Sequence, residues 1–149
     1  MKRAVTVLSL LMAGCALPGA SPRFGDFADI PRAAAATLAI ESVQTIAGIA
    51  PPASTTLQFA DVQSSGLFGA GLRSALRQAG YGVLESGVPQ VAPSATRFAY
   101  VLDTFSDPTQ YRLTLYVGEH VLSRSFTLRQ GVVMPLGEWT LSGAADVEA

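Results

Sequence analysis

The side chains that most often perform chemistry are scarce in this chain of 149 residues. His120 is its only histidine and Cys15 its only cysteine. One imidazole cannot build the ligand cluster that a transition metal needs, and no Ser–His–Asp or Cys–His set is suggested by the spacing. His120 lies beside a predicted turn, which is more typical of a strand end than of a catalyst. The inventory predicts no catalytic residue, no metal site and no cofactor, and therefore no enzyme.

Three further patterns suggest chemistry at first sight. Asp103 and Asp107 flank a turn, but this carboxylate pair has no partner group for acid–base work. The segment Gly66 to Gly71 resembles a phosphate loop only superficially, because its spacing is not G-x-G-x-x-G and no lysine follows it. These glycines are better explained by a helix that starts close to a neighbouring strand. Arg124 is a charge on an otherwise apolar strand face, and two interpretations stay open: a buried recognition charge, or a side chain that reaches out at a sheet edge.

The N-terminus has the features of a secretory signal. A basic start at Met1 to Arg3 precedes the short apolar run 4–13. A membrane-spanning helix would need roughly 20 apolar residues, which is more than this run supplies. The small pair Ala13-Gly14 before Cys15 resembles a bacterial lipobox. That resemblance implies cleavage after Gly14, a diacylglycerol on the Cys15 sulfur and an N-palmitoyl chain on its new amino group. The alternative is an ordinary secretory signal that leaves a free cysteine.

The totals limit the partners of the mature chain. Loss of residues 1–14 removes Lys2 and Arg3, so 8 of the 10 basic residues remain against 11 acidic ones. A weakly acidic chain without a basic cluster is a poor nucleic-acid binder. The composition predicts a signal peptide at 1–14, a Pro-, Gly- and Ser-rich flexible tether at 15–28 and a single periplasmic domain at 29–149.

Two helices are expected in the domain. The first follows an N-cap at Asp29, with Pro31 in its first turn, and ends before Pro51-Pro52. Whether it packs on its own domain or on a partner stays open. Its apolar stripe is predicted at Ala36, Ile40, Val43 and Ala47, with Thr37, Glu41 and Gln44 on the other side. The second helix is capped by Ser65, buries Phe68, Leu72, Ala75, Leu76 and Ala79, and stops at Gly80.

The strands are expected at 54–60, 81–85, 97–103, in a hairpin over 111–128, and at 138–142 with Trp139, whereas 131–137 is expected to be a loop. In the hairpin, Gly118-Glu119 is the pattern of a type II′ turn. The turn sets Val117 opposite His120, Leu115 opposite Leu122, Leu113 opposite Arg124 and Tyr111 opposite Phe126. The pattern predicts an α+β fold in two layers, with a mostly antiparallel sheet of about four to six strands on one or two helices.

The order of these pieces resembles the TrbH family. The resemblance rests on the cysteine of the lipobox, the segment Ala50 to Thr55, the helix–Gly–Tyr–strand segment Phe68 to Val83, the hairpin, and Trp139. It implies a structural lipoprotein of a conjugative type IV secretion system. Its lipid anchor would hold it in the outer membrane. The residue after the cysteine is Ala16 rather than Asp, which also indicates the outer membrane.

The same resemblance implies a domain that faces the periplasm and binds subunits of the channel core complex, with no small-molecule substrate. A domain of this size also looks like the N0-type modules of secretion systems, which assemble by lateral contact. The alternative is a free-standing outer-membrane lipoprotein that acts as a ligand-binding or transport auxiliary module, which should have an apolar cavity between helix and sheet.

Overall fold

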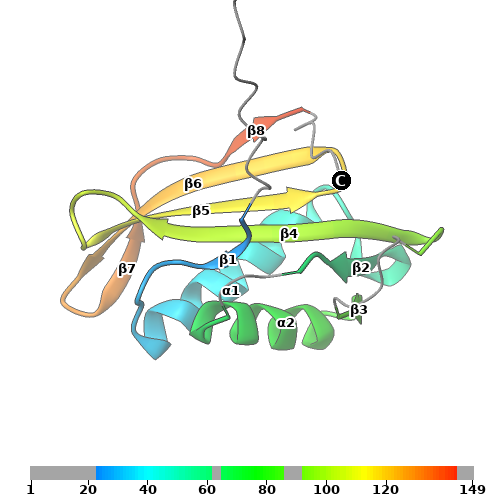
Figure 1. Cartoon of the computed structure of the whole chain (residues 1–149), viewed down its shortest axis with the longest axis horizontal. Coiled ribbons are helices and arrows are strands. Elements are labelled where there is room, and N and C mark those ends of the chain that lie inside the picture. The colour runs from blue at the N-terminus through cyan, green and yellow to red at the C-terminus, as the bar shows by residue number, and fades with distance from the viewer. Residues whose placement is uncertain (1–22, 62–64, 86–91, 144–149) are drawn as a thin grey trace, which may run out of the picture.

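The computed structural model describes residues 23–61, 65–85 and 92–143 of the chain. One mixed sheet forms the first layer, and two helices on one of its faces form the second (Figure 1). The predicted α+β class is confirmed. The elements are β1 (Gly25–Asp26), α1 (Arg32–Ala47), the 3-10 helix Pro52–Ser54, β2 (Thr56–Phe59), α2 (Leu67–Gln78), β3 (Gly82–Leu84), β4 (Ala95–Thr104), β5 (Gln110–Val117), β6 (His120–Arg129), β7 (Val132–Pro135) and β8 (Thr140–Ser142).

The sheet combines a parallel part with an antiparallel part. Its order is β3-β2-β4-β5-β6-β7, with β1 joined to β4 and β8 joined to β6. Pairs among β4 to β8 are antiparallel, whereas β1, β2 and β3 pair in parallel. The sheet has eight strands, so the predicted number was too low.

The segment 131–137 was wrongly expected to be a loop. Its first part is β7, which runs antiparallel to β6 from Arg129↔Val132 to Phe126↔Pro135. The connecting residues Gln130 and Gly131 have φ of 53° and 80°. Left-handed backbone at both central residues is the conformation of a type I′ hairpin turn. A Gln-Gly pair is a weaker turn signal than Asn-Gly, and Pro135 argues against a strand interior.

The hairpin of β5 and β6 has the predicted register throughout. Val117 lies opposite His120, Leu115 opposite Leu122, Leu113 opposite Arg124 and Tyr111 opposite Phe126. Gly118 has φ of 58°. A type II′ turn requires a positive φ of this kind at its first central residue. The turn and the apolar alternation specify the same register, so the pairing could be derived locally.

Helix α1 differs from its prediction in start and in face. It begins at Arg32, its N-cap position is Pro31, and no side chain caps it, so Asp29 is not the N-cap. The buried residues are Ala34, Ala35, Leu38, Ala39, Ser42 and Ile46. Ile40 of the predicted stripe is 57% exposed. The faces of this helix differ little in polarity, because Leu38 and Ile46 lie on the buried side and Ile40 on the exposed side.

Helix α2 buries the predicted Phe68, Leu72 and Leu76, whereas Ala79 is exposed. Ser65 is not its cap, because Gly66 occupies the N-cap position. The predicted stop is confirmed: Gly80 has φ of 93°, and the amides of Gly80 and Tyr81 donate to the carbonyls of Arg77 and Leu76. This is a Schellman motif.

The folded part of the chain begins before Asp29. Phe24 is buried against the ring of Tyr116, with 5.4 Å between centroids, and β1 pairs with Val101 and Leu102 of β4. Residues of the expected tether thus contact the sheet before Asp29. A Gly- and Pro-rich segment carries no periodicity that would announce a two-residue strand.

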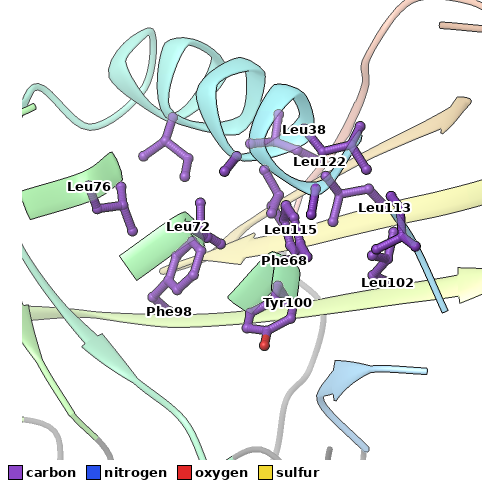
Figure 2. Packing of buried hydrophobic residues seen from close by; sticks show 14 of the residues in the cluster. Leu38, Phe68, Leu72, Leu76, Phe98, Tyr100, Leu102, Leu113, Leu115 and Leu122 are labelled. Atoms are coloured by element: carbon purple, nitrogen blue, oxygen red, sulfur yellow. The ribbon is translucent and has the colours of Figure 1, made fainter. Parts of the chain in front are cut away.

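The core fills the space between helices and sheet (Figure 2). Its fully buried side chains come from both helices and from one face of β2, β4, β5 and β6: Leu38, Ile46, Leu57, Phe68, Leu72, Leu76, Phe98, Tyr100, Leu102, Leu113, Leu115 and Phe126. The first helix thus packs on its own domain, which settles the alternative left open by the sequence.

Candidate functional site

The structure shows where most of the residues that suggested chemistry lie and what they contact. Asp103 on β4 pairs with Arg112 on β5, with 2.5 Å between Oδ2 and Nη2. Asp107 accepts the backbone N–H and the hydroxyl of Thr109 at 2.9 and 2.7 Å, and these hydrogen bonds lower the pKa of the Asp107 carboxyl. His120 is exposed at the first position of β6. Cys15 lies outside the described residues.

The glycines of the segment Gly66 to Gly71 bring α2 close to the sheet, as expected. A Cβ on Gly69 would collide with the hydroxyl of Tyr100 and lie 2.8 Å from its Cζ. A Cβ on Gly66 would lie 3.0 Å from the Cβ of Asp26. Both positions therefore need glycine because another element occupies the space of a side chain, and no phosphate-binding role has to be invoked.

A buried carboxylate meets α2 where the helix begins, and we call this contact the Asp26 joint. Oδ2 of Asp26 accepts the backbone N–H of Phe68 at 3.1 Å and of Gly69 at 3.3 Å. The first amides of a helix have no partner within it, and the positive end of the helix dipole favours an anion there. Asp26 thus takes the capping role expected of Ser65, from a segment that the sequence marked only as tether.

The Asp26 joint is incompletely satisfied. Within the described part of the chain, Oδ1 of Asp26 and the hydroxyl of Tyr100 are buried without a hydrogen-bond partner. Burial, and next the nearby charge of Asp26, raise the pKa of Tyr100 above its ordinary value. A buried polar atom without a partner opposes folding, so this joint stabilises the fold less than its contacts suggest.

A second carboxylate connects α1 to the sheet, and we call this contact the Glu41 joint. Oε1 of Glu41 lies 2.5 Å from Nη1 of Arg124 and 3.2 Å from the indole Nε1 of Trp139. Arg124 also donates from Nε to the carbonyl of Gly137 at 2.5 Å, and its guanidinium lies 5.7 Å from the ring centroid of Phe126.

The Glu41 joint settles the two interpretations of Arg124. The side chains of Arg124 and Glu41 are only 15% and 23% exposed. Arg124 therefore neither awaits a ligand nor reaches out at an edge, because it pairs within the domain. Glu41, expected to face away from the core, turns toward the sheet, and Trp139 lies just before β8 rather than within it.

The sheet offers backbone edges for a partner. β7 and β8 pair with the same side of β6, and β3 ends the other side of the sheet. All three residues of β8 are exposed, and its side chains Thr140 and Ser142 hydrogen-bond back to carbonyls of β6. Across the described ranges, β8 pairs with no strand other than β6.

Among residues 23–61, 65–85 and 92–143, no group of three or more His, Cys, Asp or Glu side chains could hold a metal ion. In the same ranges, no helix has the length and apolar character to cross a membrane.

The fold and its polar groups define a small two-layer α+β domain in which the buried Asp26 and the partly buried Glu41 and Arg124 connect the domain's own layers. The chain belongs to the TrbH family: the model of that family, described as conjugal transfer protein TrbH, matches residues 21–143. The family predicted from the order of sequence segments is thereby confirmed. Searches of curated proteins and of solved structures gave no significant match.

Proposed function

We propose that this conjugal transfer protein is a structural lipoprotein of a type IV secretion system, anchored in the outer membrane through Cys15 and bound to subunits of the channel core complex. Its work is assembly rather than catalysis. The observation that carries the proposal is the match to the conjugal transfer family over residues 21–143, because it includes every described element of the domain.

The sequence around Cys15 supports the anchor. The basic start, the short apolar run and Ala13-Gly14 precede this lone cysteine in the order that a lipoprotein signal requires. A single acyl chain binds a bilayer only marginally, and each buried CH₂ adds about 0.8 kcal/mol. Three chains on Cys15 would therefore hold the domain on the membrane almost permanently.

The packing favours partner binding over the alternative of a ligand carrier. A carrier of that kind should have an apolar cavity between helices and sheet, but large side chains such as Phe68, Tyr100 and Leu115 fill that space (Figure 2). The free side of β8 fits a partner that adds a strand, because main-chain hydrogen bonds would supply affinity there. Leu141, 59% exposed at the centre of β8, would supply a side-chain contact.

The test is a pull-down of the mature lipoprotein from detergent-solubilised outer membranes, read by mass spectrometry. Wild type is compared with Cys15→Ser, which cannot be acylated, and with Ala16→Ser, which changes the next residue and keeps the cysteine. We expect wild type and Ala16→Ser to recover secretion-channel subunits, and Cys15→Ser to recover far less. Recovery of the acylated wild-type protein alone would contradict the proposal and favour a free-standing lipoprotein.

A further inference from the structure

We propose that one end of the outer sheet face, opposite the helices, rests on the phospholipid headgroups of the membrane that holds the anchor. We call this surface the lipid-facing patch. It comprises the exposed apolar residues Phe27, Phe105, Val132, Met134 and Leu136 together with Arg23, Arg112 and Arg129. The inference rests on the proposed anchoring through Cys15, but not on the proposed binding of channel subunits.

The sheet register brings these residues together from distant parts of the chain. Met134 pairs with Thr127, and Thr127 pairs with Gln110. The carbonyl of Gln110 accepts the N–H of Phe105 at 3.1 Å, so one row across the sheet joins Met134 to Phe105.

The neighbouring row adds Leu136 and Phe27 to the patch and contains the ion pair of Arg112 with Asp103. The N–H of Leu136 donates to the carbonyl of Ser125, which lies opposite Arg112. Arg112 in turn lies opposite Asp103, and the N–H of Phe27 donates to the carbonyl of Leu102, the residue before Asp103. The two rows therefore place β1, β4, β5, β6 and β7 side by side at one end of the sheet.

Strand alternation assigns the patch to the face away from the helices. Val133 is buried in the core, so its neighbours Val132 and Met134 project from the other face. On β5 the core residues Tyr111 and Leu113 likewise leave Arg112 on that outer face.

The patch has the chemistry of a membrane interface. Phe27 is 38% exposed, Phe105 41%, Val132 61%, Met134 38% and Leu136 49%. The guanidinium of Arg23 lies 5.3 Å from the ring centroid of Phe27, and that of Arg112 lies 5.6 Å from the ring centroid of Phe105. Arg129 and Gln130 line an open hollow with Val132 and Met134. Phenylalanine and other apolar side chains next to arginines are the combination found in segments that lie in the headgroup interface.

The short segment between Cys15 and the domain favours the membrane as the partner of the lipid-facing patch. Cys15 and Arg23 are so close in the sequence that the segment between them spans at most about 28 Å when fully extended. Phe24 packs on Tyr116, which follows Arg112 and Thr114 on the outer face of β5, so the described part of the chain begins on this side. The helices cover the opposite face (Figure 1). A short anchor that enters on the outer face keeps that face near the bilayer at high effective concentration, so weak contacts are sufficient.

The experiment uses the full mature lipoprotein in vesicles of phosphatidylethanolamine with a minority of phosphatidylglycerol. Cys15 is the only cysteine of the chain, and the proposed acylation occupies its sulfur, so an added cysteine supplies the one thiol for an environment-sensitive fluorophore. Val132→Cys places the label in the patch, and Ile40→Cys places it on α1. The two native side chains are matched in exposure, at 61% and 57%, but lie on opposite layers. Vesicles that contain lipids with a quencher at the headgroup report contact.

We expect quenching at position 132 to exceed that at position 40 by about twofold or more, since an interfacial side chain enters the headgroup region. Phe105→Ser with Met134→Ser should reduce the quenching at 132 while flotation with the vesicles is kept. Equal quenching at 132 and 40 in a protein that floats overturns this inference alone. If the emission of the fluorophore at position 132 changes only after channel subunits are added, the patch binds a protein partner. That result also overturns the inference. An unacylated protein that does not float overturns the anchor and this inference together.

Discussion

Two carboxylates, the buried Asp26 and the partly buried Glu41, connect the helices to the sheet, and they differ in how completely they are satisfied. At the Glu41 joint, the carboxylate meets a guanidinium and an indole N–H, and the guanidinium also reaches a backbone carbonyl. At the Asp26 joint, the carboxylate meets only two helix amides, and Oδ1 and the Tyr100 hydroxyl have no partner in the described ranges.

The difference shows how each joint contributes to stability. The Glu41 joint loses most when one partner is removed, because the other charge then stays partly buried and unpaired. The Asp26 joint combines a useful cap with an unsatisfied hydroxyl, so its parts should respond in opposite directions. Removal of the Asp26 carboxylate should lower the free energy of unfolding, whereas removal of the Tyr100 hydroxyl should not.

The largest effect is expected for Gly69→Ala, where a new Cβ meets the rigid end of the buried Tyr100 ring. Overpacking of this kind costs about 3 kcal/mol, to be measured by urea unfolding of the Cys15→Ser mature chain. Gly71→Ala is the matched control in the same helix, since its Cβ would lie 3.7 Å from that of Ala39. We expect Gly71→Ala to be neutral or stabilising. Equal losses at both glycines would show that helix packing in general, rather than Tyr100, sets the cost.

Asp26→Ala should lower the free energy of unfolding by about 2 kcal/mol, because two helix amides lose their acceptor and a helix loses its cap. Asp26→Asn keeps an acceptor oxygen and should lose less. The same urea titration reads both. A stability of Asp26→Ala equal to that of the parent chain would mean that β1 contributes nothing through this joint.

Arg124→Met should lower the free energy of unfolding by about 1.5 kcal/mol. This value is below that of a fully buried pair because both side chains keep some exposure. Glu41→Gln combined with Arg124→Met should recover part of the loss.

The control for this pair is Arg77→Met. Arg77 pairs with Glu85 at 2.5 Å, but those side chains are 50% and 55% exposed. Exposed ion pairs contribute little to stability, so we expect little effect from Arg77→Met. Similar losses for both arginines would contradict the distinction between the buried and the exposed pair.

The smallest effect at neutral pH is expected for Tyr100→Phe, which removes an unpartnered hydroxyl and should leave stability unchanged or slightly raised. The substitution should change stability at alkaline pH. The folded state holds the pKa of Tyr100 above its ordinary value of 10.0. The corresponding stability is fully present below that value and is lost as the pH rises above it. Unfolding followed from neutral to strongly alkaline pH should therefore show a shallower alkaline loss for Tyr100→Phe, and parallel profiles would contradict this assignment.

The parts of the fold that follow from local rules could be predicted, and the parts fixed over long distances could not. The register of β5 and β6 follows from a two-residue turn and an alternating pattern within one segment. The face of α1 could not be read, because large apolar side chains lie on both sides of the helix: Leu38 and Ile46 are buried, whereas Ile40 is exposed. β7 was missed because its turn begins with Gln130 and its last residue is Pro135.

The Asp26 joint and the Glu41 joint also could not be predicted from the sequence. Asp26 lies more than forty residues before the amides that it caps, and nothing near it indicates a helix start. The signal that could have found it is indirect: Gly66 and Gly69 indicate that another element approaches the start of α2. Arg124 was recognised as a misfit on an apolar face, but its partner Glu41 is 83 residues away in the chain. Glu41 was expected on the solvent side of its helix because it is a charged residue.

The proposed anchor implies that the folded domain works in conjugal transfer only when Cys15 holds it on the membrane. The most direct measurement is the plasmid transfer frequency of a donor that lacks this protein and is complemented with wild type, Cys15→Ser or Ala16→Ser at matched levels. We expect transfer near wild type for Ala16→Ser and a loss for Cys15→Ser, although the Cys15→Ser domain stays folded by circular dichroism. Full transfer with Cys15→Ser exported and present at the wild-type level would contradict the claim.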